Sequence, residues 1–184
     1  NNVTVTGALT LTGNTSIDAN RSTNKGDITI TGATTATGLN VDLLGKAIST
    51  GAITTTGGAN QAGGTVTITA SSTVSAGAIT TSGGTASAGN PGRNAGNLTI
   101  NAGAAVTSLG TVTASGSAGV TTGDRAGGNG GTVSITAAGG IAAVAMTASG
   151  GNAVNNANGG DAGSISISNS TTGNVTTGAL TVST

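Results

Sequence analysis

The two residues of this chain that come nearest to a catalytic pair are Asp124 and Asp161. They stand at comparable places in two Gly-rich segments one repeat apart, and glycoside hydrolysis uses two carboxyl groups about 5–10 Å apart. No His, Glu, Tyr or cluster of basic residues accompanies them to assist proton transfer. We therefore expect solvated loop charges at both positions and no enzymatic activity.

Three other motifs suggest a nucleophile, a phosphate site or a metal site. Nucleophilic catalysis by a Ser–Lys pair that includes Lys25 or Lys46 is less favoured than catalysis by the two carboxylates. Gly45-Lys46 resembles the end of a phosphate-binding loop, but Ala47 follows where Ser or Thr is required. Gly159-Gly160-Asp161 resembles one element of a calcium-binding repeat whose nine-residue period is missing. We expect no catalytic, cofactor-binding or metal site.

Two surface patterns leave a binding role open. Rows of the form Thr65-Val66-Thr67 could order water on a flat face and bind ice, although unequal repeat lengths would spoil a regular lattice. Triplets of the form Asn97-Leu98-Thr99 would accept glycans on a secreted protein. Further triplets of this kind begin at Asn14, Asn169 and Asn174. Composition alone generates both patterns, so both rank below a structural role.

Composition restricts the fold. The 184 residues include 35 Gly but no Phe, Trp, Tyr, His or Cys. Aromatic side chains normally fill the centre of a compact domain, so their absence favours a narrow core of Val, Ile, Leu and Ala. Abundant Gly and Thr disfavour helix, whereas Thr, Val and Ile suit strands. Without Cys, the chain has neither a disulfide framework nor a thiolate metal site.

Charge and hydropathy exclude two classes of partner. Five bases balance five acids, so the chain has no field that would attract nucleic acid or an anionic membrane. The longest apolar run, residues 141–146, is far too short to insert into a bilayer. The charged residues are Asp18, Arg21, Lys25, Asp27, Asp42, Lys46, Arg93, Asp124, Arg125 and Asp161.

A five-residue pattern recurs along the chain: Gly, any residue, Val/Ile/Leu, Thr/Ser, Ile. Its instances begin at Gly26, Gly64, Gly96, Gly131 and Gly163. Intervals of 32 to 38 residues are typical of a solenoid. Further aliphatic positions follow in phase, as Val74 and Ile79 follow Val66. Each unit thus has three strand segments in which apolar and hydroxyl residues alternate.

The sequence therefore predicts a single all-β domain over residues 1–184, a parallel β-helix of about five to six coils, with units beginning near 26, 64, 96, 131 and 163. One inward ladder should contain the Ile that closes each pattern: Ile30, Ile68, Ile100, Ile135 and Ile167. The Gly-rich segments between units, such as 83–97 and 116–131, should align as an exposed, mobile and replaceable ridge. Residues 39–44 are extra, as an additional strand or a local cap.

The two ends of the chain are in the same phase of the repeat. Residues 6–11, Thr-Gly-Ala-Leu-Thr-Leu, match residues 177–182, Thr-Gly-Ala-Leu-Thr-Val, and neither stretch has a capping pattern. Open coils expose unpaired backbone groups and aliphatic side chains. We therefore expect the partner to be the same repeat, through covalent continuation along the axis or end-to-end stacking of identical subunits into a filament.

Residues 94–102, Asn-Ala-Gly-Asn-Leu-Thr-Ile-Asn-Ala, resemble the repeat of filamentous-haemagglutinin-like exoproteins of the bacterial two-partner secretion class. The resemblance implies a right-handed β-helix that is exported and displayed on the bacterial cell surface as a rod for adhesion, aggregation or biofilm. It also implies host or neighbouring-cell glycans as partners. The alternatives are a carbohydrate- or ice-binding face and, least favoured, a polysaccharide-degrading β-helix enzyme.

Overall fold

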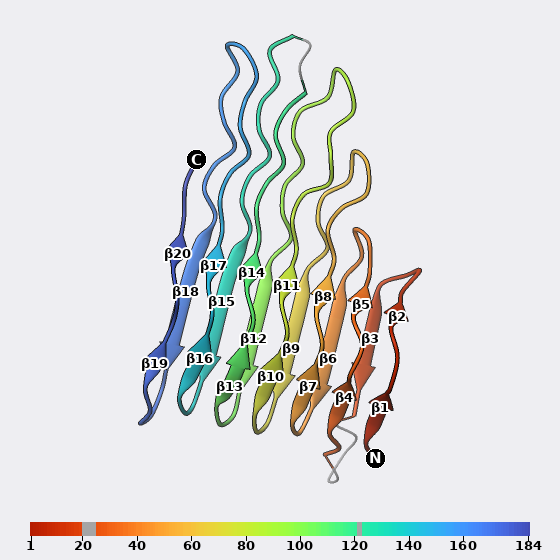
Figure 1. The fold of residues 1–184 in the computed structure, drawn as a ribbon, viewed down its shortest axis with the longest axis vertical. Helices are drawn as coiled ribbons and strands as arrows, with labels where there is room; N and C mark the ends of the chain where they lie inside the picture. Colours follow the sequence, from red (N-terminus) through yellow and green to blue (C-terminus); the bar gives the residue numbers. More distant parts are fainter. Residues whose placement is uncertain (20–24, 121–122) are drawn as a thin grey trace.

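The computed structural model describes residues 1–19, 25–120 and 123–184. It is an all-β solenoid that winds through three parallel sheets, and the described residues contain no helix (Figure 1). Sheets A and B have seven strands each and sheet C has six. The chain visits A, B and C in turn, so six full coils precede a partial seventh. The predicted fold class is confirmed.

Each coil contributes one strand to each sheet. Sheet A contains β1 (Val3–Val5), β4 (Ile28–Ile30), β7 (Ile48–Thr50), β10 (Val74–Ala76), β13 (Val106–Leu109), β16 (Ile141–Ala143) and β19 (Val175–Thr176). Sheet B contains β2 (Leu9–Thr10), β5 (Thr34–Thr35), β8 (Ile53–Thr54), β11 (Ile79–Thr80), β14 (Val112–Thr113), β17 (Met146–Thr147) and β20 (Leu180–Thr181). Sheet C contains β3 (Thr15–Asp18), β6 (Val41–Gly45), β9 (Val66–Ala70), β12 (Leu98–Ala102), β15 (Thr132–Ala137) and β18 (Ser164–Asn169).

Alternation along the strands builds the core. In β9, β12 and β15 every second residue points inward, and Ile68, Ile100 and Ile135 are fully buried register partners. Aliphatic side chains stacked rung upon rung fill this narrow interior without any aromatic residue. The Thr, Ser and Asn residues between them lie on the outer face and are partly or fully exposed.

The prediction for Ile30 is wrong. It belongs to β4 of sheet A and pairs with Thr50 of β7. The sheet C rung beside Ile68 is held by Leu43. Residues 39–44 supply that strand, β6, so the additional-strand alternative is confirmed and coil 2 is a coil of its own. The five-residue pattern does not distinguish the two sheets, because aliphatic and hydroxyl residues alternate in the strands of sheet A as they do in those of sheet C.

Four long excursions leave the solenoid between sheets B and C. They comprise residues 55–65, 81–97, 114–131 and 148–163 in coils 3 to 6, and we call them the glycine arms, although positions 121–122 lie outside the described residues. Each has an outgoing half from sheet B and a returning half to sheet C. Figure 1 shows the arms projecting together beyond the sheets. The predicted alignment into a ridge is confirmed.

Candidate functional site

The two candidate carboxylates lie at different positions along the arms. Asp124 is at the tip of the coil 5 arm, where its Oδ1 accepts a hydrogen bond from the backbone N–H of Asn156 at 3.2 Å. Asp161 is on the returning half of the coil 6 arm, and its N–H donates to Oδ1 of Asn129 at 2.9 Å. Asp161 is therefore the counterpart of Asn129, not of Asp124. In the described ranges, no three His, Cys, Asp or Glu residues gather as metal ligands.

The two lysines lie away from the arms, near the turns that lead into sheet A. Lys46 is exposed in the turn between β6 and β7, and its N–H donates to the carbonyl oxygen of Gly26 at 2.7 Å. Gly45 ends β6, and the next element is the strand β7. A phosphate-binding loop is followed by a helix whose N-terminus faces the phosphate, so this segment does not have that architecture. Lys25 is exposed in the turn before β4. Arg21 lies outside the described residues.

Backbone hydrogen bonds of 2.8–3.0 Å join each arm to the next. In the outgoing halves, the carbonyl oxygens of Ser82, Ser115 and Ser149 accept from the N–H groups of Gly57, Gly83 and Gly116. Gly150 of the coil 6 arm donates in the same way to Ser183, which follows β20 in the partial seventh coil. The returning halves pair in the same direction, with Asn94, Asn129 and Asp161 as acceptors for Gly63, Ala95 and Gly130. The arms therefore form a second hydrogen-bonded layer outside the three sheets. The sequence did not indicate this hydrogen-bonded layer; that the arms are replaceable stays a prediction.

Glycine is needed where the two halves of an arm touch. A Cβ added to Gly83, Gly116 or Gly150 would lie less than 3.0 Å from a backbone carbonyl oxygen of the returning half of the same arm. Real Cβ atoms essentially never approach so closely. The glycines thus act as packing residues that let two backbones meet, as the absence of Cβ allows.

Buried threonines close the base of two arms. Thr55 Oγ1 donates to the carbonyl oxygen of Gly64 at 2.6 Å, and Thr81 Oγ1 donates to that of Gly96 at 2.8 Å. Both threonines are fully buried. A buried hydroxyl with a partner stabilises its site, whereas an unpartnered one costs free energy. Thr34, in sheet B of coil 2, is such a case, since its buried Oγ1 has no hydrogen-bond partner.

Asparagine side chains link successive coils, which the sequence reasoning missed. Oδ1 of Asn94 accepts from the N–H of Asn129, and Oδ1 of Asn97 accepts from the N–H of Thr132, both at 2.8 Å. Asn40 binds Thr65 in the same way. In each pair the acceptor belongs to the coil before the donor. The sequence signal for these links is an Asn that recurs just before the strands of sheet C. Asn97, which begins one of the glycan-acceptor triplets, accepts such a hydrogen bond through its side chain.

Near its tip, the described part of each arm has one residue of positive φ: Asn60, Gly89, Gly123 and Asn155. Adjacent tips are tied together. Asn60 exchanges two hydrogen bonds with Ser87, of 2.7 and 2.8 Å, and Asn155 Nδ2 donates to the carbonyl oxygen of Gly123 at 2.9 Å. The tips are therefore held in place from one coil to the next.

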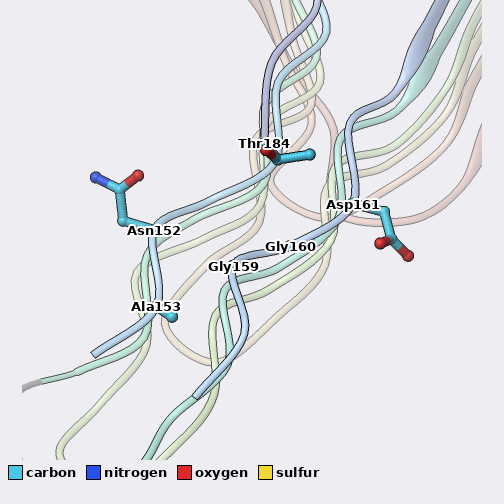
Figure 2. A pocket seen from close by; sticks show the side chains of 6 residues that line it. All are labelled: Asn152, Ala153, Gly159, Gly160, Asp161 and Thr184. Carbon is cyan, nitrogen blue, oxygen red and sulfur yellow. The ribbon is translucent and has the colours of Figure 1, made fainter. Parts of the chain in front are cut away.

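A groove of about 550 Å³ lies on the open face of the coil 6 arm, lined by Asn152, Ala153, Gly159, Gly160, Asp161 and Thr184. Figure 2 shows the side chains of Asn152 and Asp161 pointing away from each other, with the Gly159-Gly160 backbone between them. The groove is thus floored by backbone, and its polar side chains do not converge as those of a catalytic or sugar-binding pocket do.

In coils 3 to 6 the outer face of sheet C is a regular array of hydroxyl and amide groups. One row runs through Thr67, Thr99, Ser134 and Ser166, and the next through Thr69, Asn101, Thr136 and Ser168. The register of this sheet shows no shift, whereas sheet A has one at β13. The differences in unit length are absorbed by the arms and turns, so they do not disturb this face.

The described residues include no helix with the length and apolarity to cross a membrane. Comparisons with protein families, with curated proteins and with solved structures yield no match to this chain.

Proposed function

We propose that this chain is a structural segment of a secreted, rod-like surface fibre, of the kind that the resemblance to filamentous-haemagglutinin-like exoproteins implies. The rod would extend along the solenoid axis and serve adhesion, aggregation or a biofilm matrix at the bacterial cell surface. It needs no catalytic group. The absence of converging carboxylates among the described side chains agrees with this role.

The observation that carries the proposal is the uninterrupted stacking of the coils along one axis. Leu9 of β2 and Leu180 of β20 stand at the two ends of one unbroken column in sheet B. Inside that column Ile53, Ile79, Val112 and Met146 are fully buried against the coils on either side. Stacking of like coils is how a repeat fold buries its core, and it extends the molecule along one axis.

Imaging of native material, combined with the intact mass of the denatured chain, tests the proposal. A long polypeptide would form the rod covalently, whereas subunits of this size would stack end to end. Both give rods of constant width with strands about 4.8 Å apart along the axis. A strictly monomeric 16.7 kDa particle at high concentration would refute axial assembly.

The outer face of sheet C favours a second candidate function, binding to ice. Its hydroxyl rows are in continuous register, which removes the objection from unequal repeat lengths. Regularly spaced hydroxyls hold ordered water through hydrogen bonds. Ice-affinity partitioning tests this function. Thr99→Lys should abolish uptake of the protein into ice. Thr107→Lys, which changes an exposed residue of sheet A, should not. Equal uptake by both variants would rule out the sheet C face.

A further inference from the structure

The outer face of sheet B repeats one residue type on every coil. The outward residue of each strand is a threonine, and successive threonines are register partners from β2 to β20. This column consists of Thr10, Thr35, Thr54, Thr80, Thr113, Thr147 and Thr181. Thr suits any exposed strand position, yet the outward positions of sheet C include Asp42 and Asn101. Strand propensity alone therefore does not account for a column that contains only threonine.

Two further columns complete this face, one on each side of the threonines. The column two residues before them contains Ala33, Ala52, Ala78, Thr111, Ala145 and Ala179. The column two residues after them contains Thr37, Thr56, Ser82, Ser115, Ser149 and Ser183. Backbone hydrogen bonds of 2.8–3.0 Å join successive coils at both columns. The residues of all three columns are partly or fully exposed, so the columns share the outer side of the sheet.

This face is uncharged and even. The seven strands of sheet B contain no charged residue, and their register shows no shift, whereas sheet A has one at β13. A hydroxyl group both donates and accepts hydrogen bonds. Within the face, Ser183 Oγ donates to Ser149 Oγ at 2.9 Å. Rows of hydroxyl groups are therefore complementary to a second set of the same rows.

We propose that the outer face of sheet B binds the same face of a second copy of this chain, so that two rods pair side by side. The backbone ladder sets a spacing of about 4.8 Å between rungs, and a second copy has the same spacing. Each rung can then meet a matching rung along the whole face, whereas a partner without this period would match only a few. Methyl groups of Ala and Thr are buried, and hydroxyl groups pair across the contact. The inference goes beyond the proposed function, because it concerns contact between rods and not growth along the axis.

The size of the face sets the strength of this pairing. Seven rungs about 4.8 Å apart and three columns about 7 Å apart make a face of roughly 700 Å². A stable complex buries about 800 Å² on each partner. One chain of this length therefore offers slightly less than a standard interface, so its pairing should be reversible. Longer rods should pair more tightly, because each coil adds contact area.

Cross-linking of the 184-residue chain tests the inference. The chain contains no Cys, so Thr80→Cys introduces a single thiol. Thr80 is on β11, the fourth of the seven strands of sheet B. Faces paired in full overlap therefore bring two copies of this position together, whether the rods run parallel or antiparallel. We expect a short bis-maleimide to give a covalent dimer.

Ser75→Cys is the matched control for that variant. Ser75 lies in the same coil and is also partly exposed, but it is on the outer face of sheet A. This variant should stay monomeric. End-to-end stacking would leave two thiols at position 80 about 34 Å apart, beyond the reach of the reagent, so it cannot imitate side-by-side pairing.

Sedimentation velocity gives a second, independent measurement. Thr80→Lys would place like charges opposite each other and should weaken the pairing roughly tenfold or more, with the melting temperature unchanged. Ser75→Lys should leave the pairing as it is in the native chain. Equal dimer yields for the two cysteine variants, or equal pairing of the two lysine variants, would overturn the proposal.

Ice-affinity partitioning of the same lysine variants separates a second copy from ordered water as the occupant of this face. Loss of uptake into ice by Thr80→Lys, with its sedimentation unchanged, would make ordered water the ligand and would overturn the proposal. Growth along the axis is measured by particle length. Failure of rod formation is therefore distinguishable from failure of side-by-side pairing.

Discussion

Gly160 of the coil 6 arm lies directly against the carbonyl oxygen of Gly128 in the arm before it, so closely that a Cβ on Gly160 would come within 3.0 Å of that oxygen. Gly160→Ala should therefore force the two arms apart and cost about 1–3 kcal/mol of folding free energy. For a chain of this length the melting temperature should fall by roughly 2–4 °C per kcal/mol.

The neighbouring Gly159→Ala is the control for that substitution. A Cβ on Gly159 would meet only the carbonyl oxygen of Gly151, at an ordinary 3.6 Å. Alanine there should be neutral or should stabilise by up to about 1 kcal/mol, because it restricts the unfolded chain. Equal melting temperatures for the two variants would mean that the arms do not pack as described.

A pair of threonine substitutions tests the buried hydroxyls. Thr81→Val removes the donor to the carbonyl oxygen of Gly96 and should cost about 1–3 kcal/mol. Thr34→Val has the same shape change but removes a buried hydroxyl that has no partner, so it should be neutral or stabilising. Denaturant titration of both variants gives the comparison, and a more stable Thr81→Val protein would contradict the assigned hydrogen bond.

Shortening the coil 4 arm by six residues should preserve the solenoid. Deletion of residues 86–91 leaves an arm that matches residues 55–65 position for position, with Gly92 at the place of Asn60, whose φ is 59°. The β-sheet circular dichroism should remain, with a melting temperature a few degrees lower because tip contacts to both neighbouring arms are lost. Deleting 82–87 instead removes Gly83 and Gly84, and should destabilise more.

Ile100→Asp should unfold the solenoid around coil 4. It would place an unpaired carboxylate in a fully buried column and cost more than about 4 kcal/mol. Thr99→Asp, one residue away on the outer face, should change stability by less than about 1 kcal/mol. An unchanged melting temperature and β signal for Ile100→Asp would show that the register is wrong.

The enzymatic alternative is tested by a broad glycan depolymerisation assay. We expect no cleavage by the native chain, because Asp124 and Asp161 occupy different positions along their arms and the carboxylate of Asp124 accepts a hydrogen bond from the N–H of Asn156. Cleavage that disappears in Asp124→Asn or Asp161→Asn would overturn the proposed structural role.

The three-sheet path of coils 3 to 6 was predictable from residue types, because inward positions such as Val66, Val74 and Ile79 recur at nearly constant spacing. Coil 2 was not. Its sheet C strand contains Leu43 and Leu44 in place of the Val-Thr-Ile pattern, while Ile28 and Ile30 imitate that pattern in sheet A. Alternation of aliphatic and hydroxyl residues predicts a strand with one face toward the core and one toward solvent. Which of the sheets the strand joins depends on its pairing with the neighbouring coils.

The hydrogen-bonded layer of the arms was not predictable for a different reason. Gly promotes flexible turns and also permits close backbone packing, and composition does not distinguish the two roles. In Gly84 and Gly96 the second role applies, since both are buried against another chain segment.

The arms also make the solenoid mechanically uneven. Two separate sets of hydrogen bonds join coils 3 to 6 to one another: those of the three sheets and those of the arm layer. Coils 1 and 2 are joined by the hydrogen bonds of the sheets and by short turns. Under tension along the axis, coils 1 and 2 should separate first. Coils 3 to 6 should remain joined until both sets of hydrogen bonds break. A single-molecule pulling trace should then show two force levels. Tensile strength would be graded along the rod by the length of each arm, with the spacing between coils left unaltered.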